Sequence, residues 1–275
     1  MRNEKKMARP FSCDFTTSLE AGNVEFHMHS HHEIFFLLEG NIQYFAENAC
    51  YPMTSGSLIL FSVNEIHKAV NVTNAPFTRL VIHIQPEFVQ PYCTPVTNLL
   101  ACFHREPGVG NLVLLSQEEQ ARLLSMASSL GEIMKNQERF GNDVEAVTLY
   151  LQILVFVNRA WKKAGSSAGA PLPHRTQAIM DYVDAHLTDT LTLDSIAGAL
   201  ALDKYYLSHL FKSETGSTIF QYVLVKRIAL AKTLLSRGHT VAESCHLSGF
   251  NDYSNFIRSF KQITGYTPGQ FRGSV

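Results

Sequence analysis

The sequence predicts an α+β protein of two domains, with a small β-barrel followed by helices in residues 1–163 and an all-α region in residues 175–275. Two observations carry this prediction. Short apolar segments alternate with turn residues over residues 24–85, whereas helical periodicity fills residues 116–163 and the C-terminal region. Residues 164–174, between the two parts, are rich in Gly, Ser and Pro, which is typical of a linker.

The composition is that of a globular chain. The 275 residues are 45% hydrophobic and 17% charged, so each domain can bury a core of its own. The five cysteines are scattered and form no CxxC pair, which indicates reduced thiols in a cytoplasmic protein. No apolar run reaches 18 residues, and the N-terminus lacks an apolar signal segment, so we expect neither a membrane span nor secretion.

Seven short segments in the first domain predict the strands of a sandwich or small barrel. Their expected positions are residues 24–28, 33–38, 42–46, 49–52, 57–61, 67–71 and 78–84. Turn residues such as Gly40, Gly56 and Pro76 separate them. Residues 1–22 are polar and are expected to be irregular at first.

Two amphipathic helices follow the strands. A capping box formed by Ser116 and Glu119 opens the first, which is expected to run to about residue 139. Its apolar stripe comprises Leu123, Ala127, Leu130 and Met134. The second is expected to end near residue 163, with an apolar face of Val144, Val147, Leu151, Leu154 and Val155. These helices, in residues 116–163, either cover the barrel or pair with a second chain, and an apolar stripe does not distinguish the two.

The C-terminal region contains one pattern twice. Residues 203–218 precede residues 252–267 by 49 positions, and Asp, Phe, Lys, Thr, Gly and Thr recur in register. Each copy begins with an aspartate that can cap a helix, continues as a short amphipathic helix and ends at a glycine. A shorter helix and a tight turn precede each copy. Residues 191–214 and 240–263 therefore predict two helix-turn-helix units.

One long helix is expected between the two units, at residues 218–237. A helix of about 20 residues spans about 30 Å, close to the roughly 34 Å between successive major grooves on one face of DNA. We expect it to bury Phe220, Val223, Ile228, Ala231, Leu234 and Leu235. The expected inward residues of the flanking helices are Tyr206, Leu207, Leu210 and Phe211 in the first, and Phe256, Ser259 and Phe260 in the second.

Positive charge is concentrated in the same region. The whole chain has a net charge of −1, but residues 203–275 carry nine Lys and Arg against four Asp and Glu. A basic region that coincides with two helix-turn-helix units favours contact with DNA phosphates.

From about residue 191 to residue 272 the chain resembles the AraC/XylS family of transcription regulators. The matching segments are LSHLFK at 207–212, TG at 215–216, RIALA at 227–231, LL at 234–235, GF at 249–250, FIRSFK at 256–261, GYTP at 265–268 and FR at 271–272. The family usually has Ser at the first cap and Arg late in the first reading helix, where this chain has Asp203 and His209. The Ile-Ala pair of the second support helix is replaced by Ser244 and Cys245.

The resemblance implies which residues read DNA. Base contacts are expected from Tyr205, Ser208 and His209 in the first unit, and from Tyr253, Ser254 and Arg258 in the second. The same outer faces carry Lys204, Lys212, Asn255 and Lys261, of which Lys212 and Lys261 are expected to contact phosphates. Arg258 is the expected guanine contact, since arginine can bind guanine through two hydrogen bonds.

Histidines gather near the start of the barrel region. His27 and His29 are expected to alternate on one strand and so to share a face. Together with Glu33, Gly40 and His67 they resemble the motif of the cupin barrel, although its usual Pro-x-Gly before the last histidine is absent. In metal-binding cupins these positions hold a divalent ion. The resemblance thus implies a candidate metal site at His27, His29, Glu33 and His67, although the sequence requires no cofactor.

A small-molecule pocket is the other interpretation of these side chains, because such barrels can enclose one ligand. In the AraC/XylS family the ligand is often a sugar or another metabolite. The residues expected to line the pocket are His27, His29, Glu33, Phe35, Tyr44, His67 and His83. If the histidines merely line a polar barrel mouth, His31 and His32 are expected to be exposed.

These observations predict a cytoplasmic, sequence-specific transcription regulator controlled by a small-molecule effector in a cupin-like barrel. It is expected to be a homodimer without catalytic residues that binds operator half-sites in adjacent major grooves of double-stranded DNA, with RNA polymerase as a candidate further partner. The alternative is a metal-dependent cupin enzyme, an isomerase or dioxygenase, fused to a helical module. A helical protein-interaction module without DNA is a third hypothesis, which fits the charge and the repeat poorly.

Overall fold

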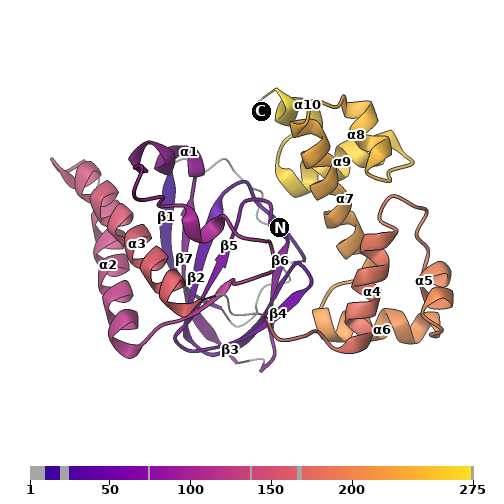
Figure 1. The fold of residues 1–275 in the computed structure, drawn as a ribbon, viewed down its shortest axis with the longest axis horizontal. Coiled ribbons are helices and arrows are strands. Elements are labelled where there is room, and N and C mark those ends of the chain that lie inside the picture. Colours follow the sequence, from indigo (N-terminus) through magenta and orange to yellow (C-terminus); the bar gives the residue numbers. More distant parts are fainter. Residues whose placement is uncertain (1–9, 19–24, 74, 137, 166–168, 274–275) are drawn as a thin grey trace.

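The computed structural model describes residues 10–18, 25–73, 75–136, 138–165 and 169–273. It confirms the predicted α+β class, with sheets and a helix pair in the N-terminal part and helices alone in the C-terminal part (Figure 1). Among these residues, none of the helices combines the length and the apolar character needed to span a bilayer. Several predictions fall on residues outside the described ranges, namely those for residues 1–9 and 19–22, Val24 of the first expected strand, Asn74 of a turn, residue 137 of the first expected helix and residues 166–168 of the linker.

Two antiparallel sheets form the barrel. The larger has the order β1 (Phe11–Ser18), β7 (Phe77–Ile84), β2 (His32–Glu39), β5 (Ser57–Phe61) and β8 (Leu112–Leu114). The smaller has the order β4 (Ala49–Thr54), β3 (Asn41–Ala46) and β6 (His67–Asn71). Aromatic side chains from both sheets, among them Phe35, Tyr44, Tyr51 and Phe61, fill the space between them as one buried cluster.

Three parts of the strand prediction were wrong. The region expected to be irregular contains β1, which pairs with β7 along its whole length, and β8 was not expected at all. Residues 25–28 were expected to form a strand, but His27 makes only a single bridge with His67. The reason is that β1 buries only Phe11 and Cys13 among polar neighbours, so its pairing partner decides its conformation more than its own pattern does.

The helix pair packs against the larger sheet. Helix α2 (Gln117–Lys135) begins with the predicted capping box and buries Leu123, Ala127 and Leu130 as expected. The predicted inward face of α3 (Asn142–Ala164) was only partly right, since Leu154 alone of its five residues is buried. The barrel covers Ala146, Tyr150, Ile153, Leu154 and Val157, whereas Val144 is 62% exposed and Val147, Leu151 and Val155 are half-buried.

The chemistry of the barrel explains this choice of face. Helix α3 has apolar residues on more than one side, and the Tyr150 ring stacks on Phe11 of β1 with centroids 4.1 Å apart. The face with the larger ring gains the closer packing. A short helix α1 (Pro86–Val89) and the 3₁₀ turns η1 (Gln90–Tyr92) and η2 (Ala101–Phe103) connect β7 to this part.

The C-terminal region is a helical bundle organised around α7 (Ile219–Ser236). The other helices are α4 (His174–Ala185), α5 (Leu193–Ala199), α6 (Lys204–Thr215), α8 (Val241–Leu247), α9 (Tyr253–Thr264) and α10 (Pro268–Arg272). Both α6 and α9 pack on α7. As predicted, Asp203 and Asp252 accept backbone N–H groups at the starts of α6 and α9, and Gly216 and Gly265 end these helices with positive φ.

Two inward predictions in this region failed. Phe220, in the first turn of α7, is 47% exposed and lies outside the apolar cluster that the described residues of the bundle form. Tyr206 is also exposed, and the guanidinium of Arg175 lies over its ring, 5.2 Å from the ring centroid. In α9 all three predicted inward residues, Phe256, Ser259 and Phe260, are buried.

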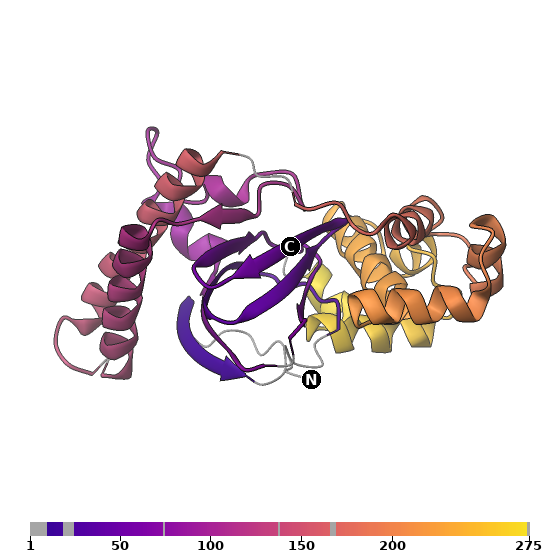
Figure 2. The same cartoon turned by 90° about the horizontal axis from the view of Figure 1, so that it is seen from below.

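The bundle lies beside the smaller sheet, where α7 and α4 face β4 and β6 (Figures 1 and 2). One apolar cluster crosses the boundary: Phe26, Phe45 and Ile66 of the barrel pack with Tyr222 and its neighbours in the bundle. The two parts of the chain are therefore joined by a common core as well as by the linker.

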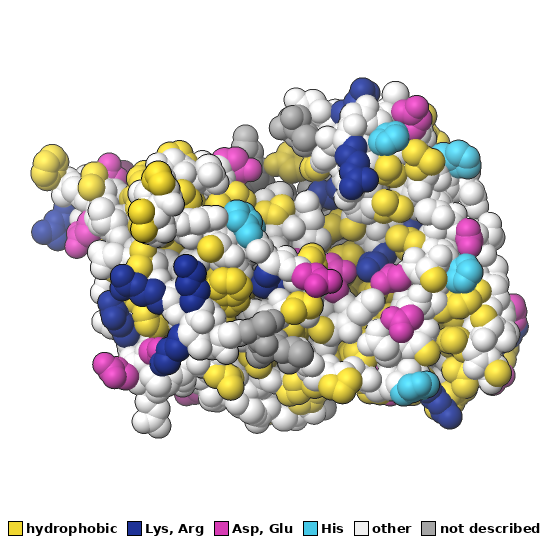
Figure 3. Space-filling model, in the orientation of Figure 1, with side chains coloured by type: hydrophobic (Ala, Val, Ile, Leu, Met, Phe, Trp, Pro, Cys, Tyr) yellow, Lys and Arg dark blue, Asp and Glu magenta, His cyan; other side chains and the backbone are white. Residues whose placement is uncertain are grey.

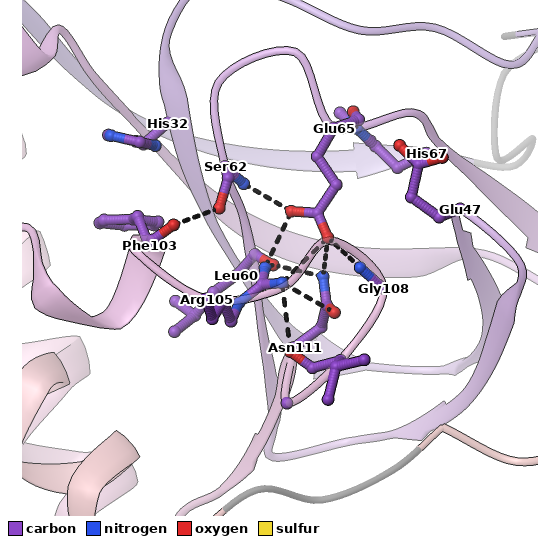
Figure 4. Close-up of polar contacts among 12 residues, drawn as sticks. His32, Glu47, Leu60, Ser62, Glu65, His67, Phe103, Arg105, Gly108 and Asn111 are labelled. Atoms are coloured by element: carbon purple, nitrogen blue, oxygen red, sulfur yellow. Dashed lines mark hydrogen bonds and ion pairs between the residues drawn. The ribbon is translucent and has the colours of Figure 1, made fainter. Parts of the chain in front are cut away.

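A buried carboxylate holds the loop between β5 and β6. Glu65 accepts hydrogen bonds from the backbone N–H groups of Ser62 and Gly108, both at 2.7 Å, and from the Asn111 side chain at 2.8 Å. Arg105 lies 2.9 Å from the same carboxylate and is itself almost completely buried (Figure 4). Because each charge compensates the desolvation of the other, loss of either one leaves an unpaired charge in the interior.

We therefore expect Glu65→Gln to lower the free energy of unfolding by about 3–5 kcal/mol. The matched control is Glu132→Gln, which breaks the exposed pair between Glu132 and Lys135 and should cost about 0–1 kcal/mol. Urea unfolding followed by circular dichroism measures both. Equal stability of the two variants would show that the Glu65 network contributes nothing special.

Candidate functional site

Histidines from three parts of the chain meet around one carboxylate inside the barrel domain. The segment before β2 supplies His27, His29 and His31, and β2 itself supplies Glu33. His67 is the first residue of β6, and His83 lies opposite Glu33 in the β2–β7 pair. Ring centroids lie 4.3 Å apart for His27 and His67, 4.9 Å for His29 and His67, 3.9 Å for His29 and His31, and 4.4 Å for His31 and His83. We refer to His27, His29, His31, Glu33, His67 and His83 as the histidine cluster.

Backbone carbonyl groups orient three of these rings. The Nδ1 atom of His67 donates to the carbonyl of Glu65 at 2.8 Å, and that of His29 donates to the carbonyl of His31 at 2.7 Å. The Nδ1 atom of His27 is bonded in the same way to the carbonyl of Glu25 at 3.1 Å. Fixing Nδ1 as the donor leaves Nε2 as the second functional atom of each ring.

The Glu33 carboxylate is the acidic centre of the cluster. One of its oxygens lies 3.1 Å from Nε2 of His29 and 3.2 Å from Nε2 of His83. Burial alone would raise the pKa of Glu33, but the hydrogen bonds from His29 and His83 hold this pKa well below its usual range. Burial likewise holds the pKa of His67 well below its usual range, so His67 is a neutral imidazole at pH 7.

The donor atoms are spaced closely enough to surround one ion. The ligand atoms of His29, Glu33 and His67, all buried, lie within 4.8 Å of one another, and so do those of His31, Glu33 and His83. The Nε2 atoms of His31 and His67 are buried, and neither has a hydrogen-bond partner among the described residues. A buried imidazole nitrogen without a partner is costly, and a bound cation is one way to satisfy it. These residues fit a divalent metal.

The cluster differs in composition from the predicted site. His29, Glu33 and His67 of the candidate metal set are brought together, while His27 is outside both groups of ligand atoms. Phe35 and Tyr44 were expected to line a pocket, but both belong to the packed core of the barrel, where their ring centroids lie 5.0 Å apart. His31 was missed because it lies in a loop, where strand alternation gives no direction. His32, also a candidate exposed residue, is buried and stacks on Phe103 at 4.2 Å.

The candidate DNA-reading residues lie on the outer faces of α6 and α9. Tyr253, Ser254, Asn255, Arg258 and Lys261 of α9 are all exposed. In α6, Tyr205, His209 and Lys212 are exposed, whereas Lys204 and Ser208 are half-buried. Two polar faces carried by helices that both pack on α7 are the layout that groove reading requires.

Local bonds distinguish the two units. Lys204 is bound to Asp194 of α5 at 2.9 Å, and Arg258 donates to the Asn255 side chain at 3.1 Å. At the replaced pair of the second support helix, Ser244 and Cys245 are both buried, and Ser244 Oγ lacks a hydrogen-bond partner among the residues described. The smaller side chains therefore leave this unit with a polar atom in its core.

Comparison with known families separates the same two parts. Residues 19–154 match the model of the AraC-like ligand binding domain, and residues 196–274 match a model of the helix-turn-helix domain. The first match contains the histidine cluster, and the second contains both reading helices.

Known relatives are regulators. Over 232 residues the chain is 23% identical to the uncharacterized HTH-type transcriptional regulator YbfI of Bacillus subtilis, which covers 83% of this chain and 80% of YbfI. It is 31% identical over 133 residues to the arabinose operon regulatory protein of Escherichia coli, covering 48% of this chain and 44% of that protein, so it spans less than half of the arabinose regulator. The crystal structure of ToxT from Vibrio cholerae O395 aligns over 96% of this chain and 97% of the ToxT chain, with 15% sequence identity and a TM-score of 0.38.

The AraC-like ligand binding domain precedes the helix-turn-helix domain in one chain. The first match contains most of the barrel, and the second contains most of the helical bundle. The chain belongs to the AraC/XylS family of transcriptional regulators and is a ligand-controlled transcriptional regulator.

Proposed function

We propose that this regulator inserts α6 and α9 into two neighbouring major grooves of double-stranded DNA. The 18 residues of α7, on which both helices pack, correspond to about 27 Å, near the roughly 34 Å between such grooves. Base contacts are assigned to Tyr205, Ser208 and His209 of α6 and to Tyr253, Ser254 and Arg258 of α9. Lys212 and Lys261 bind phosphates.

The two reading helices differ in what they offer. Arg258 is exposed and held by Asn255, so its guanidinium is available for a bidentate contact with guanine. In α6 the corresponding donor is His209, a shorter side chain that lacks the guanidinium fork, and Lys204 is already engaged by Asp194. We assign the sharper base discrimination to α9.

A homodimer through α3 is the second part of the proposal. A second apolar stripe of α3, in which Val144 is exposed and Val147, Leu151 and Val155 are only half-buried, recurs at the three- and four-residue spacing of a coiled-coil seam. The first turn of α3 is acidic and its last turn is basic, so two antiparallel copies bring opposite charges together around a two-fold axis. Lys and Arg side chains gather over the lower part of this helix pair (Figure 3).

We further propose that the effector site is the histidine cluster and that its ligand is a divalent transition-metal ion. Imidazole and carboxylate oxygen are suitable donors for such ions. Metal-ligating histidines are commonly oriented by a hydrogen bond from the other ring nitrogen to a backbone carbonyl, as His29 and His67 are. His29, Glu33 and His67 would hold the ion, which would supply a fixed positive charge beside Glu33. A sugar or other metabolite, expected from the resemblance, stays a prediction.

The proposal assigns the barrel a sensing role rather than catalysis. Relatives that match 83% and 48% of the chain are both named as regulators. Because its target is DNA, the regulator is expected to act in the cytoplasm.

The change Arg258→Ala should cost about 1–3 kcal/mol of binding free energy and relax sequence preference at one base position. The measurement is fluorescence anisotropy with duplexes from the promoter region of the chain's own coding sequence, each carrying one substituted base pair. The comparison variant Lys261→Ala should instead weaken binding to all duplexes alike and reduce the slope of affinity against salt by about 1. A uniform loss in Arg258→Ala would remove its assignment as a base contact.

Placing a charge in the proposed seam should separate the dimer. In Leu151→Glu, two carboxylates near the middle of α3 would meet in the interface, at a cost of about 3 kcal/mol or more, which raises the dissociation constant more than about 100-fold. Gln152→Glu adds the same charge at the exposed neighbouring position and should leave the dimer intact. Sedimentation velocity distinguishes these outcomes. Unchanged association of Leu151→Glu would exclude this face of α3.

Loss of His67 should remove metal binding. Loss of a group that only supports a metal ligand costs roughly 10–100-fold in affinity, so we expect at least about 100-fold weaker Zn²⁺ binding in His67→Gln. Isothermal titration of the EDTA-treated full chain measures this, and the exposed His246 of α8 provides the control His246→Gln. Equal Zn²⁺ affinities for the two variants would contradict the metal proposal.

A further inference from the structure

The barrel contacts the DNA-binding helices through the residue next to His67. Along β6, the side chain of His67 is fully buried in the barrel, and that of Lys68 points to the opposite side. Lys68 is only 5% exposed. Its Nζ donates to Ser217 Oγ at 2.5 Å and lies 3.7 Å from the carboxylate of Glu25, to which Ser217 donates a further hydrogen bond. Ser217 lies in the corner between α6 and α7.

Two further contacts come from the other side of His67. Glu47, in the turn between β3 and β4, accepts a hydrogen bond from the backbone N–H of Ile66 at 2.8 Å with one carboxylate oxygen. Its other oxygen lies 3.3 Å from Nζ of Lys226 in α7. Asn64 accepts a hydrogen bond from Lys232 of α7 at 2.6 Å. His67 is therefore flanked in the chain, on both sides, by residues tied to the DNA-binding domain.

Backbone conformation marks the same positions. Among the described residues of the barrel, Glu47 and Asn64 are the non-glycine residues with positive φ, at 48° and 63°. Positive φ is the left-handed conformation that favours glycine. The chain keeps a glutamate and an asparagine there in spite of the steric cost of their side chains. Both side chains reach lysines of α7, which places local strain where the two domains are joined.

The segment before β2 is connected in the same way. His27 forms a backbone bridge with His67, with N···O distances of 3.1 and 2.9 Å. Its neighbour Phe26 meets the ring of Tyr222 of α7 edge to face at 5.2 Å. Glu25, next along the chain, belongs to the contact with Lys68 and Ser217. Two of the three backbone segments that carry cluster histidines, the one before β2 and the start of β6, thus also carry contacts with α7 or with the corner before it.

We propose that these contacts form a latch, made of Lys68 with Ser217 and Glu25, Glu47 with Lys226, and Asn64 with Lys232, that restrains DNA binding until a ligand at the histidine cluster loosens it. Only the role of the ligand rests on the proposed function. The latch holds the corner between α6 and α7, and so fixes the first reading helix relative to the barrel.

The physical reason for restraint is geometric and electrostatic. Both reading helices must fit successive grooves at once, and a domain that is fixed to the barrel cannot adjust its orientation as a domain on a Gly- and Ser-rich linker can. The latch also places the Glu47 carboxylate 3.3 Å from Nζ of Lys226, which Asp184 of α4 already approaches to 3.0 Å. A ligand held by His29, Glu33 and His67 would pull on the segment that leads from Glu25 to His29 and on the start of β6, both of which carry latch contacts, and so favours the released state.

The test uses two variants of the barrel, so that no DNA contact is removed. Lys68→Met and Glu47→Gln change the net charge in opposite directions, and electrostatic attraction to DNA alone would make the first bind more weakly and the second more tightly. Release of the latch predicts tighter binding in both, by about fivefold or more. The measurement is the affinity of the metal-free full chain for a promoter duplex at fixed salt.

Controls with the same charge changes come from the exposed pair of α2. Lys135→Met and Glu132→Gln should show only the electrostatic effect. If Lys68→Met does not fold, Ser217→Ala removes the hydroxyl that joins Lys68 to Glu25 and carries the same expectation. Variants of the latch that bind DNA no more tightly than their charge-matched controls would overturn the proposal.

A second comparison tests the link to the cluster. Addition of Zn²⁺ to the wild-type chain should tighten DNA binding by a similar factor, and Lys68→Met should lose this response while still binding Zn²⁺. If the wild-type chain binds no Zn²⁺, the metal assignment fails, yet the metal-free comparison still decides on the latch. Zn²⁺ binding with an equal DNA response in wild type and Lys68→Met would overturn the coupling.

Discussion

The buried pair of Glu65 and Arg105 is the interaction on which the rest of the site depends (Figure 4). In the interior an unpaired carboxylate is costly, so the loop before β6 is held in the conformation in which both carboxylate oxygens of Glu65 accept hydrogen bonds. The carbonyl of Glu65 orients His67, and the N–H of Ile66 holds Glu47. A single loop thus positions a cluster histidine and a contact with the other domain.

Alternation along β6 gives this arrangement its two directions. Successive side chains of a strand point to opposite faces, so His67 enters the barrel and Lys68 reaches the corner of the helical bundle. Sensing and DNA-binding parts are then one residue apart on a rigid element. Coupling between the histidine cluster and the helical bundle therefore does not require a long series of intervening side chains. The shared apolar cluster around Phe26 and Tyr222 keeps the two parts in contact.

In the DNA-binding half, most of the structure could be predicted because its signals are local. A cap acts on backbone groups two or three residues away, and helical periodicity repeats within four residues, as at Asp203, Asp252 and Gly265. The errors at Tyr206 and Phe220 occurred where an apolar side chain lies beyond the reach of its neighbours. In the barrel, β1 and most of the inward face of α3 were missed, because Phe11 and Tyr150 meet across more than a hundred residues of chain.

The sequence by itself determined the two-domain order, the tandem helix-turn-helix units with their caps, and the histidine-rich character of the barrel. Tertiary structure alone decided that His31 joins the cluster, that Phe35 and Tyr44 belong to the packed core, and that Lys68 faces the helical bundle. The physical reason is distance along the chain. Hydrogen bonds within a helix are set by adjacent residues, whereas strand register, ring packing and contacts between domains depend on partners that only the folded chain brings together.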